Sequence, residues 1–383
     1  MGAVRPARAA RRRVPSVNHA PRRARLAAAL SEHGVTAVLV TWPVNVRYLS
    51  GLASSNAAVL VTGAGEALLA TDARYVETAR RVCEGVEVIE DRDVAGALLR
   101  RARESGGPGR IAVEATHMSV GAFHALSGQH AGEYAGEHGG GHVLVPVADL
   151  VETVRAVKDE GEIEALRRAC AITDEAFSRV VERIAPGMTE SELARRLEAA
   201  MVELGADKPA FDTIVAAGPN GSIPHHSPSG RPIEPGDLVT MDFGALHDGY
   251  HADMTRTVAV GRPAAWQRDL YDLVREAQRA GRHAVRPGAT AGEVDAAARD
   301  LIAAAGHGEH FGHGLGHGVG LEIHELPFLG PNRTGRLEDR VPITVEPGVY
   351  LPGMGGVRIE DTLVTRDEGP ELLTLSTKEL LVL

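Results

Sequence analysis

The chain is poor in several residue types, and each scarcity narrows the class of protein. Its 383 residues include two cysteines, Cys83 and Cys170, which form neither a CxxC pair nor a disulfide framework, so we expect a reducing, cytoplasmic setting. Aromatic residues make up only 4% of the chain, so the core must consist mainly of Ala, Val and Leu. No apolar run is long enough to cross a bilayer. A net charge of −10 argues against nucleic acid as a partner.

Acidic residues are absent from the first 25 positions, which carry eight arginines: Arg5, Arg8, Arg11, Arg12, Arg13, Arg22, Arg23 and Arg25. Such a composition is typical of a targeting or nucleic-acid-binding arm, or of a disordered extension. No apolar segment follows it, so a secretory signal is not expected. We interpret residues 1–20 as a disordered basic extension. Removal of residues 1–19 should leave turnover unchanged, and a large drop would contradict this interpretation.

Residues 21–147 alternate between helical and extended patterns. The patterns predict helices over 22–33, 74–83 and 95–105, and strands over 35–43, 57–63, 66–72 and 110–116. Alternation of this kind indicates an α/β domain with its own small sheet. The glycine-rich stretch 133–143 is expected to be a loop, and nothing in this domain looks catalytic.

Residues 148–383 form a second predicted domain, which begins with a strongly helical segment and contains an internal repeat. The pattern P-G-x-T-x-x-E-[LV] occurs twice, in segments that begin at Ala185 and Arg286. Each copy supplies a predicted capping box that would open a helix: Thr189 with Glu192, and Thr290 with Glu293. Two related halves indicate a pseudo-two-fold domain whose site lies between them.

The segment from Gly306 to Glu325 holds five of the seventeen histidines: His307, His310, His313, His317 and His324. Glycine occupies nearly every second position in its middle, which lets the backbone pass close to another group. Histidine is the commonest neutral metal ligand. The segment therefore predicts a metal site.

Four acids flank this segment, in runs that the pattern predicts as strands: Asp242, Asp253, Glu346 and Glu360. A carboxylate inside an apolar strand is costly to bury unless it is paired or binds a metal. Four carboxylates match the charge of two divalent cations, and oxygen-rich ligation with one imidazole suits Mn²⁺, with Co²⁺ or Zn²⁺ as alternatives. Two metals roughly 3.5–4 Å apart can bridge a water and make it a hydroxide near neutral pH.

Six motifs follow one another in the second domain: IPHHSP (223–228), MDFG (241–244), ADMTRT (252–257), GHGLGHGVGLEIHE (312–325), VEPGVY (345–350) and VRIEDT (357–362). In these motifs and their order, residues 150–383 resemble the pita-bread-fold metallopeptidases, specifically the aminopeptidase P and prolidase branch. VRYLSG (46–51) and TDARYVETA (71–79) resemble the same branch. The resemblance implies a creatinase/prolidase-like α/β N-terminal domain, an α+β pita-bread catalytic domain and a homodimer.

The resemblance also assigns roles to individual residues. The implied metal ligands are Asp242, Asp253, His317, Glu346 and Glu360, of which Asp253 and Glu360 would bridge two ions. Glu346 would also be the general base. The implied residues of the substrate cleft are His225, His313, His324, Arg358 and Ile323. Among them, His324 would stabilise the oxyanion, Arg358 would fix the far end of the substrate, and Ile323 would wall the prolyl pocket. Three further histidines have no counterpart and are treated as ordinary polar residues: His226, His307 and His310.

The expected reaction is hydrolysis of the N-terminal Xaa-Pro bond of a peptide by a metal-bridging hydroxide, that is, Xaa-Pro aminopeptidase activity. Some prolidase-like members carry Arg shortly after the His-Glu pair, whereas this chain has Phe328 in that neighbourhood. This difference favours the aminopeptidase over an Xaa-Pro dipeptidase (prolidase), although Arg358 or the N-terminal domain could supply the charge. Two other functions stay open: a same-fold hydrolase acting on a small non-peptide amide, and a binding protein that has lost catalysis. Metal analysis and peptide turnover separate these alternatives.

Overall fold

The structure, a computed structural model, describes residues 19–104, 109–132 and 142–383. The chain divides into two compact units, Met1–Val154 and Arg155–Leu383, and the boundary suggested by the sequence, after residue 147, stays a prediction.

Of the predicted basic extension only His19 and Ala20 are described. Ala20 begins a helix, and His19 Nδ1 lies 2.9 Å from the carbonyl oxygen of Tyr48. The loop predicted at 133–143 lies outside the described residues except for its last two positions.

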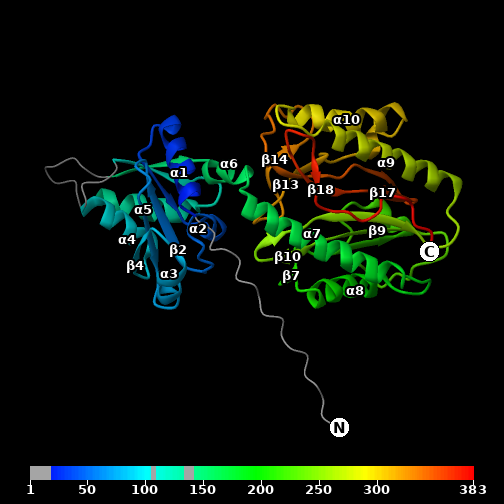
Figure 1. The fold of residues 1–383 in the computed structure, drawn as a ribbon, viewed down its shortest axis with the longest axis horizontal. Helices are drawn as coiled ribbons and strands as arrows, with labels where there is room; N and C mark the ends of the chain where they lie inside the picture. The colour runs from blue at the N-terminus through cyan, green and yellow to red at the C-terminus, as the bar shows by residue number, and fades with distance from the viewer. Residues whose placement is uncertain (1–18, 105–108, 133–141) are drawn as a thin grey trace, which may run out of the picture. The chain divides into compact units, whose positions relative to one another are not determined.

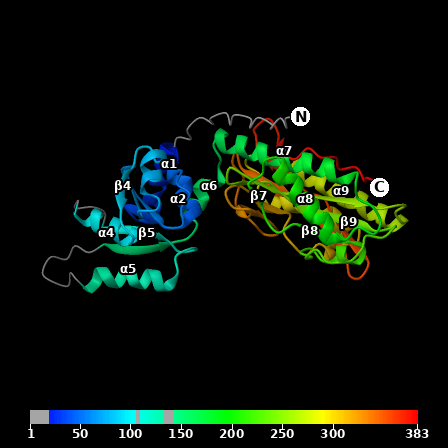
Figure 2. The ribbon, with the colours of Figure 1, turned by 90° about the horizontal axis from the view of Figure 1, so that it is seen from below.

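The first unit contains a six-stranded sheet with the order β4-β3-β2-β1-β5-β6, antiparallel at β1–β2 and β2–β3 and parallel elsewhere. Its strands are β1 Ala37–Val40, β2 Ala57–Thr62, β3 Ala67–Thr71, β4 Glu87–Glu90, β5 Arg110–Glu114 and β6 Val143–Val147. Its helices are α1 Ala20–Ala29, η1 Leu30–His33, α2 Pro43–Ser50, α3 Val76–Val82, α4 Val94–Glu104, α5 Val120–Gly132 and α6 Leu150–Ala156, which runs into the second unit. Figure 2 shows α5 and the α1–α2 pair on opposite sides of this sheet.

One strand of this sheet is shorter than the sequence predicts. The apolar run 35–43 was expected to be extended throughout, but β1 ends at Val40 and Pro43 opens α2. Proline is well placed in the first turn of a helix, where its missing N–H has no partner to lose. The motif VRYLSG therefore forms the end of α2, with Gly51 as the C-cap.

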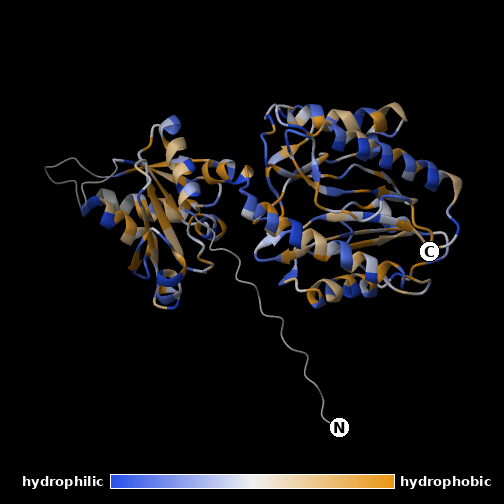
Figure 3. Cartoon of the chain, viewed as in Figure 1, coloured by the Kyte–Doolittle hydropathy of each residue, from blue (hydrophilic) through white to orange (hydrophobic). Residues whose placement is uncertain are grey.

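The second unit has two halves, each built from a helix pair packed on strands. The helices are α7 Glu160–Val181, α8 Glu190–Glu203, α9 Ala265–Ala284 and α10 Ala291–Ala304. Figure 1 shows α9 and α10 along one side of the strands and α8 along the opposite side. Each pair packs on a separate apolar core, represented by Leu197 and Phe243 in one half and by Val274 and Ile343 in the other. Strands in the interior are largely apolar, whereas the helices expose polar faces (Figure 3).

The strands of this unit are β7 Lys208–Pro209, β8 Ile214–Ala217, β9 Leu238–Phe243, β10 Ala245–His247, β11 Tyr250–His251, β12 Met254–Ala259, β13 Gly316–Gly318, β14 Glu325–Leu329, β15 Pro342–Val345, β16 Gly348–Leu351, β17 Gly355–Arg358, β18 Asp361–Val364 and β19 Glu371–Leu372. They form sheets β12-β9-β8, β14-β13-β15-β18-β19, β11-β10-β7 and β16-β17. Two short single-turn helices, η2 Gly218–Ser222 and η3 Gly308–His310, lie in connections.

The internal repeat appears in equivalent positions of the two halves. Thr189 is the N-cap of α8 and Thr290 the N-cap of α10, and each also forms an isolated antiparallel bridge to a later segment. Of the two predicted capping boxes, the one that opens α10 is complete. In α8 the carboxylate of Glu192 instead accepts from Arg196 at 2.6 Å, so the predicted second half of that box is wrong.

The four predicted acids do not all lie within strands. Asp242 is in β9, but Asp253 directly precedes β12, Glu346 follows β15, and Glu360 lies between β17 and β18. The expectation of four strand-borne acids is therefore wrong for three of them. At a strand end the ladder of backbone hydrogen bonds stops, which frees the chain to turn a carboxylate towards the space between two sheets. No helix in the described part of the chain is long and apolar enough to cross a membrane.

Candidate metal centre

Asp242 and Asp253 are brought together by a hairpin. Strands β9 and β12 pair antiparallel with Asp242 opposite Thr255, and the intervening β10–β11 connection turns at Asp248 and Gly249, both with positive φ. Asp253 lies two residues before Thr255, on the same side of the strand by alternation. Both carboxylates are buried and both line a cavity of about 580 Å³.

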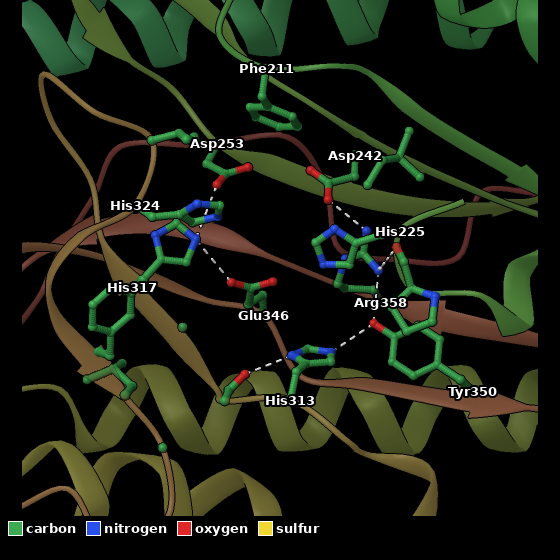
Figure 4. Close-up of a pocket in the computed structure, with 18 of the residues that line it drawn as sticks. Phe211, His225, Asp242, Asp253, His313, His317, His324, Glu346, Tyr350 and Arg358 are labelled. Carbon is green, nitrogen blue, oxygen red and sulfur yellow. Dashed lines mark hydrogen bonds and ion pairs between the residues drawn. The ribbon is translucent and has the colours of Figure 1, made fainter. Parts of the chain in front are cut away.

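His317, in β13, presents one defined nitrogen to these acids. Its Nδ1 lies 2.9 Å from the carbonyl oxygen of Gly318, and because a carbonyl only accepts, Nδ1 must carry the proton. The lone pair is then on Nε2, which lies 3.5 Å from Asp253 Oδ2 and 3.4 Å from Glu346 Oε1. A carbonyl that fixes the tautomer in this way is the usual second support of a metal-binding histidine. Figure 4 shows the three side chains converging.

Glu360 lies deeper and completes the group. Donor atoms of Asp253, His317 and Glu360 all lie within 4.8 Å of one another. Thr255 Oγ1 donates to Glu360 Oε2 at 2.8 Å, whereas Glu360 Oε1 and Asp242 Oδ1 are buried without a hydrogen-bond partner among the described residues. Buried carboxylate oxygens without a donor are rare and call for an explanation such as an ion.

The electrostatics of the group support the same conclusion. Burial raises the pKa of Glu346 to about 8, and burial together with the neighbouring carboxylates raises the pKa values of Asp253 and Glu360. Burial lowers the pKa of His317 to about 4, so the imidazole is neutral at pH 7. Acceptors facing one another in a buried space fit divalent cations, which would neutralise the carboxylates. The predicted ligand residues therefore come together and suit a metal centre.

Arg358 is buried beside this centre and its guanidinium is already engaged. It donates to Asp242 at 2.7 Å, to the Tyr350 hydroxyl at 2.9 Å and to Thr255 Oγ1 at 3.1 Å. Because these acceptors hold it in the wall, it is poorly placed to reach the far end of a substrate, the role implied by the resemblance. That role stays a prediction.

Tyr350 is a residue that the sequence did not single out, although it lies in the quoted motif VEPGVY. Its hydroxyl lies 2.9 Å from His313 Nε2, and His313 Nδ1 lies 2.8 Å from the carbonyl oxygen of Gly314. Since Nδ1 must donate to the carbonyl, Nε2 accepts from Tyr350, whose oxygen accepts from Arg358. Burial lowers the pKa of His313 to about 4, which keeps this chain of bonds in one protonation state.

The other predicted cleft residues also line the cavity. His324 stands edge-on to His317, with ring centroids 4.5 Å apart, and His225 lies across from it (Figure 4). Ile323 lines the cavity as well. The histidines left without a role lie outside its lining: His226 is within 2.9 Å of Glu190 Oε2, and His307 and His310 contact each other.

The cavity rim carries Phe328, which the resemblance already sets beside the substrate, and two residues that the sequence does not single out, Phe211 and Arg333. Phe328 is 41% exposed at the rim, and Phe211 lines the same space. Arg333, five positions after Phe328, also lines the cavity with an exposed side chain, and no ion pair to it occurs among the described residues. No motif contains Arg333, so only the fold reveals it.

Fold and site together define a metallopeptidase. The chain belongs to metallopeptidase family M24, whose model matches residues 164–367, and the creatinase/prolidase N-terminal domain model matches residues 22–157. The predicted combination of a creatinase-type N-terminal domain and a pita-bread catalytic domain is thereby confirmed.

Two solved structures and one sequence relative are similar to this chain over most of its length. An Xaa-Pro dipeptidase from Bacillus anthracis has 37% identity and a TM-score of 0.89, over 96% of this chain and 100% of that one. An X-Pro aminopeptidase from Thermotoga maritima has 36% identity and a TM-score of 0.82, over 94% and 99%. The Xaa-Pro dipeptidase of Pyrococcus furiosus is 36% identical over 353 residues, 92% of this chain and 97% of its own length.

Proposed function

We propose that this chain is a metal-dependent Xaa-Pro dipeptidase, which hydrolyses the bond between a first residue and a proline. The observation that carries the proposal is the buried Asp253–His317–Glu360 group beside an open cavity in a chain of family M24. Relatives named Xaa-Pro dipeptidase cover nearly the whole chain and supply the substrate class.

The metal ions are proposed as two Mn²⁺, with Co²⁺ or Zn²⁺ as alternatives. The residues that would hold them are Asp242, Asp253, His317, Glu346 and Glu360. Bound there, they would supply Lewis-acid polarisation of the scissile carbonyl and activation of water. Glu346 takes the proton from the attacking water and passes it to the prolyl nitrogen as the C–N bond breaks. His324 donates a hydrogen bond to the carbonyl oxygen as negative charge develops there.

The other side chains of the cavity select and hold the substrate. A prolyl peptide bond has no N–H, so a peptidase that needs that donor fails on it, and the pyrrolidine ring must be recognised by its shape. Ile323 and Phe328 offer apolar surface for the ring. His225 and His313 flank the substrate beside the metals.

Preference for a dipeptide is supported by Arg333. A dipeptide carries its own carboxylate directly after proline, and Arg333 is an exposed cation on the cavity wall. By resemblance, some prolidase-like members carry an Arg in the neighbourhood of Phe328, and its absence there favours the aminopeptidase. Arg333 can supply the same charge from five residues further along, so this absence no longer argues against a dipeptidase.

Xaa-Pro aminopeptidase activity is the second candidate. It is favoured by the Thermotoga relative of that name and by the exposure of Phe328, which leaves room at the rim for a longer chain. In a longer peptide the carbonyl of proline is part of the next peptide bond, so there is no carboxylate at that position to pair with Arg333.

The decisive experiment compares Mn²⁺-dependent cleavage of Gly-Pro, Gly-Pro-amide and Arg-Pro-Pro, with a chelated control. A dipeptidase cleaves Gly-Pro best, and Arg333→Met raises its KM for Gly-Pro about tenfold while leaving Gly-Pro-amide unaffected. Arg336→Met, in the same loop but outside the cavity lining, is the matched control. Preference for Arg-Pro-Pro would establish the aminopeptidase. No cleavage of any of the three with metal bound would favour a non-peptide amide substrate.

We also propose that the chain forms a homodimer, which light scattering on the purified chain tests. The expected cytoplasmic location is tested by cell fractionation.

A further inference from the structure

A group of four charged residues, three of them buried and Glu322 partly exposed, lies behind the turn that carries His324. Arg155 and Lys158 are 2% and 1% exposed, and Glu325 is 7% exposed. Lys158 Nζ donates to Glu325 Oε2 at 2.7 Å, and Arg155 Nη2 donates to Glu325 Oε1. Arg155 Nη1 also donates to Glu322 Oε2 at 2.9 Å. None of the four lines the cavity.

Such a group is not explained by stability alone. Removing Arg155, Lys158 and Glu325 from water costs more than their attraction usually returns, and apolar side chains of similar volume often stabilise a fold as well. Buried ion groups are instead retained in some proteins because they impose one arrangement on a segment. Although burial acts against the charged form, Lys158 and Arg155 lower the pKa of Glu325 to about 2, so this carboxylate is ionised at pH 7.

The cations are themselves fixed in place. Arg155 lies in α6, and the backbone N–H of Lys158 donates to the carbonyl oxygen of Arg340 at 2.9 Å. Asp159, the next residue, is the N-cap of α7 with a complete capping box. The segment 155–159 therefore presents its two cations from a rigid support.

Glu325 connects these cations to the turn that lines the cavity. It opens β14 and pairs with Gly318 in β13, the residue directly after the proposed ligand His317. Its Oε1 also accepts from the backbone N–H of Glu322 at 2.9 Å, which closes the turn 322–325. Glu325 is buried while the preceding His324 is exposed in the cavity, as alternation along an extended chain requires.

We propose that Arg155 and Lys158 are positioning residues for His324: through Glu325 they hold the turn that aims its imidazole at the scissile carbonyl oxygen. The role assumed for His324 rests on the proposed function. The cations touch neither substrate nor metal ligand. They act on the reaction only through the turn.

A double-mutant cycle tests this link. Lys158→Met and His324→Ala are each expected to lower kcat about 10²-fold, because a displacement of about 1 Å at a reacting group can cost that much. The double variant should be no slower than His324→Ala alone, since the lost interaction is the same one. Lys158→Arg, which keeps the charge, should restore most of the activity. Multiplied losses in the double variant would overturn the proposal.

Two controls separate positioning from general damage. Metal content and KM should stay near wild type in Lys158→Met, and a loss of bound metal would refute a role confined to His324. Arg167→Met removes another ion pair of the same region, with Glu371 at 2.6 Å, and should leave kcat unchanged. Glu325→Gln, which removes the acceptor charge, serves as the second variant if Lys158→Met does not fold.

A second measurement does not depend on turnover. His324 is exposed, so diethyl pyrocarbonate should modify it, and mass spectrometry gives the rate for that residue. The rate should change several-fold in Lys158→Met and Glu325→Gln but not in Arg167→Met. An unchanged rate overturns the positioning claim. A changed rate in a protein that cleaves no Xaa-Pro substrate would instead reject the proposed function and keep the positional link.

Discussion

At the scale of single residues, two backbone carbonyls decide the chemistry of the histidines. The carbonyl oxygen of Gly318 accepts a hydrogen bond from Nδ1–H of His317, and that of Gly314 accepts one from Nδ1–H of His313, so each ring offers Nε2 as an acceptor. The Nε2 lone pair of His317 faces carboxylates, so a cation between them would satisfy both. The Nε2 lone pair of His313 faces the Tyr350 hydroxyl, which donates a hydrogen bond to it. Two rings with the same tautomer thus serve different purposes because of what lies opposite.

The variant Glu346→Gln distinguishes the two proposed functions of this side chain, general base and metal ligand. The amide keeps an oxygen that can bind metal but cannot take a proton, so turnover should fall about 10²-fold or more with metal content largely retained. Steady-state kinetics and metal analysis on the same sample measure both. Near-normal turnover would remove Glu346 from the base role.

His313 makes stability depend on pH in a defined window. Burial lowers its pKa from 6.5 to about 4, so between these values the unfolded chain binds a proton that the folded chain does not. The contribution of neutral His313 is complete above pH 6.5 and is lost as the pH falls towards 4. Urea unfolding of chelator-treated wild type and His313→Gln should show a difference in free energy that shrinks over this window. A constant difference would contradict the assignment.

Motif likeness named most of the residues that meet at the cavity, but not their contacts. The implied ligands come together as expected, while their individual roles stay predictions. Tyr350 was overlooked because its importance depends on Arg358 and His313 reaching it from other segments. Arg333 was overlooked because a lone exposed arginine in a loop carries no signal until the loop is placed beside a cavity.

At the scale of elements, β13 must run unusually close to its neighbour. A methyl group on Gly316 would collide with the carbonyl oxygen of Thr344 in β15 and lie 2.9 Å from its hydroxyl. Thr344 in turn donates to Glu346 at 3.1 Å and accepts from the backbone N–H of His317. The small residue beside His317 therefore keeps a ligand strand and its supporting threonine in register.

Gly316→Ala should weaken metal binding about tenfold or more, because displaced supporting contacts typically cost that much in affinity. Calorimetric titration of the metal-free protein with Mn²⁺ measures the change. Gly312→Ala is the matched control, since a methyl group there meets nothing within 4 Å. Equal affinities for the two variants would show that β13 can move away without losing its ligand geometry.

Elements were predicted better than their ends. The helical segment after residue 150 and the two capping signals predicted α7, α8 and α10, and the Thr189–Thr290 repeat predicted two related halves, whereas α9 was not predicted. The strand ends bearing Asp253, Glu346 and Glu360 were not predicted, because a run of apolar residues does not show where its hydrogen-bond partner stops.

At the scale of the whole molecule, the second unit gathers carboxyl groups that a bound cation would stabilise in their charged form. Four carboxylates lie in one buried region, with Arg358 as the cation that pairs directly with one of them. Binding of metal to the folded state alone should raise its stability, by about 2.7 kcal/mol when free metal exceeds its Kd a hundredfold. Thermal unfolding with and without Mn²⁺ should therefore show a higher Tm in the metal-loaded protein. Equal Tm values would argue against occupancy of this site.

The segment 155–159 has a consequence for how this chain can be divided. The family M24 match begins at residue 164, after Arg155 and Lys158. A gene fragment cut at that match would encode every proposed metal ligand and cleft residue, yet omit the cations that Glu325 accepts from. Such a fragment would leave a buried acid without its partners. If the N-terminal unit were exchanged for another, by engineering or in evolution, the junction would therefore have to lie before Arg155. The start of the family M24 match, at residue 164, does not indicate that position.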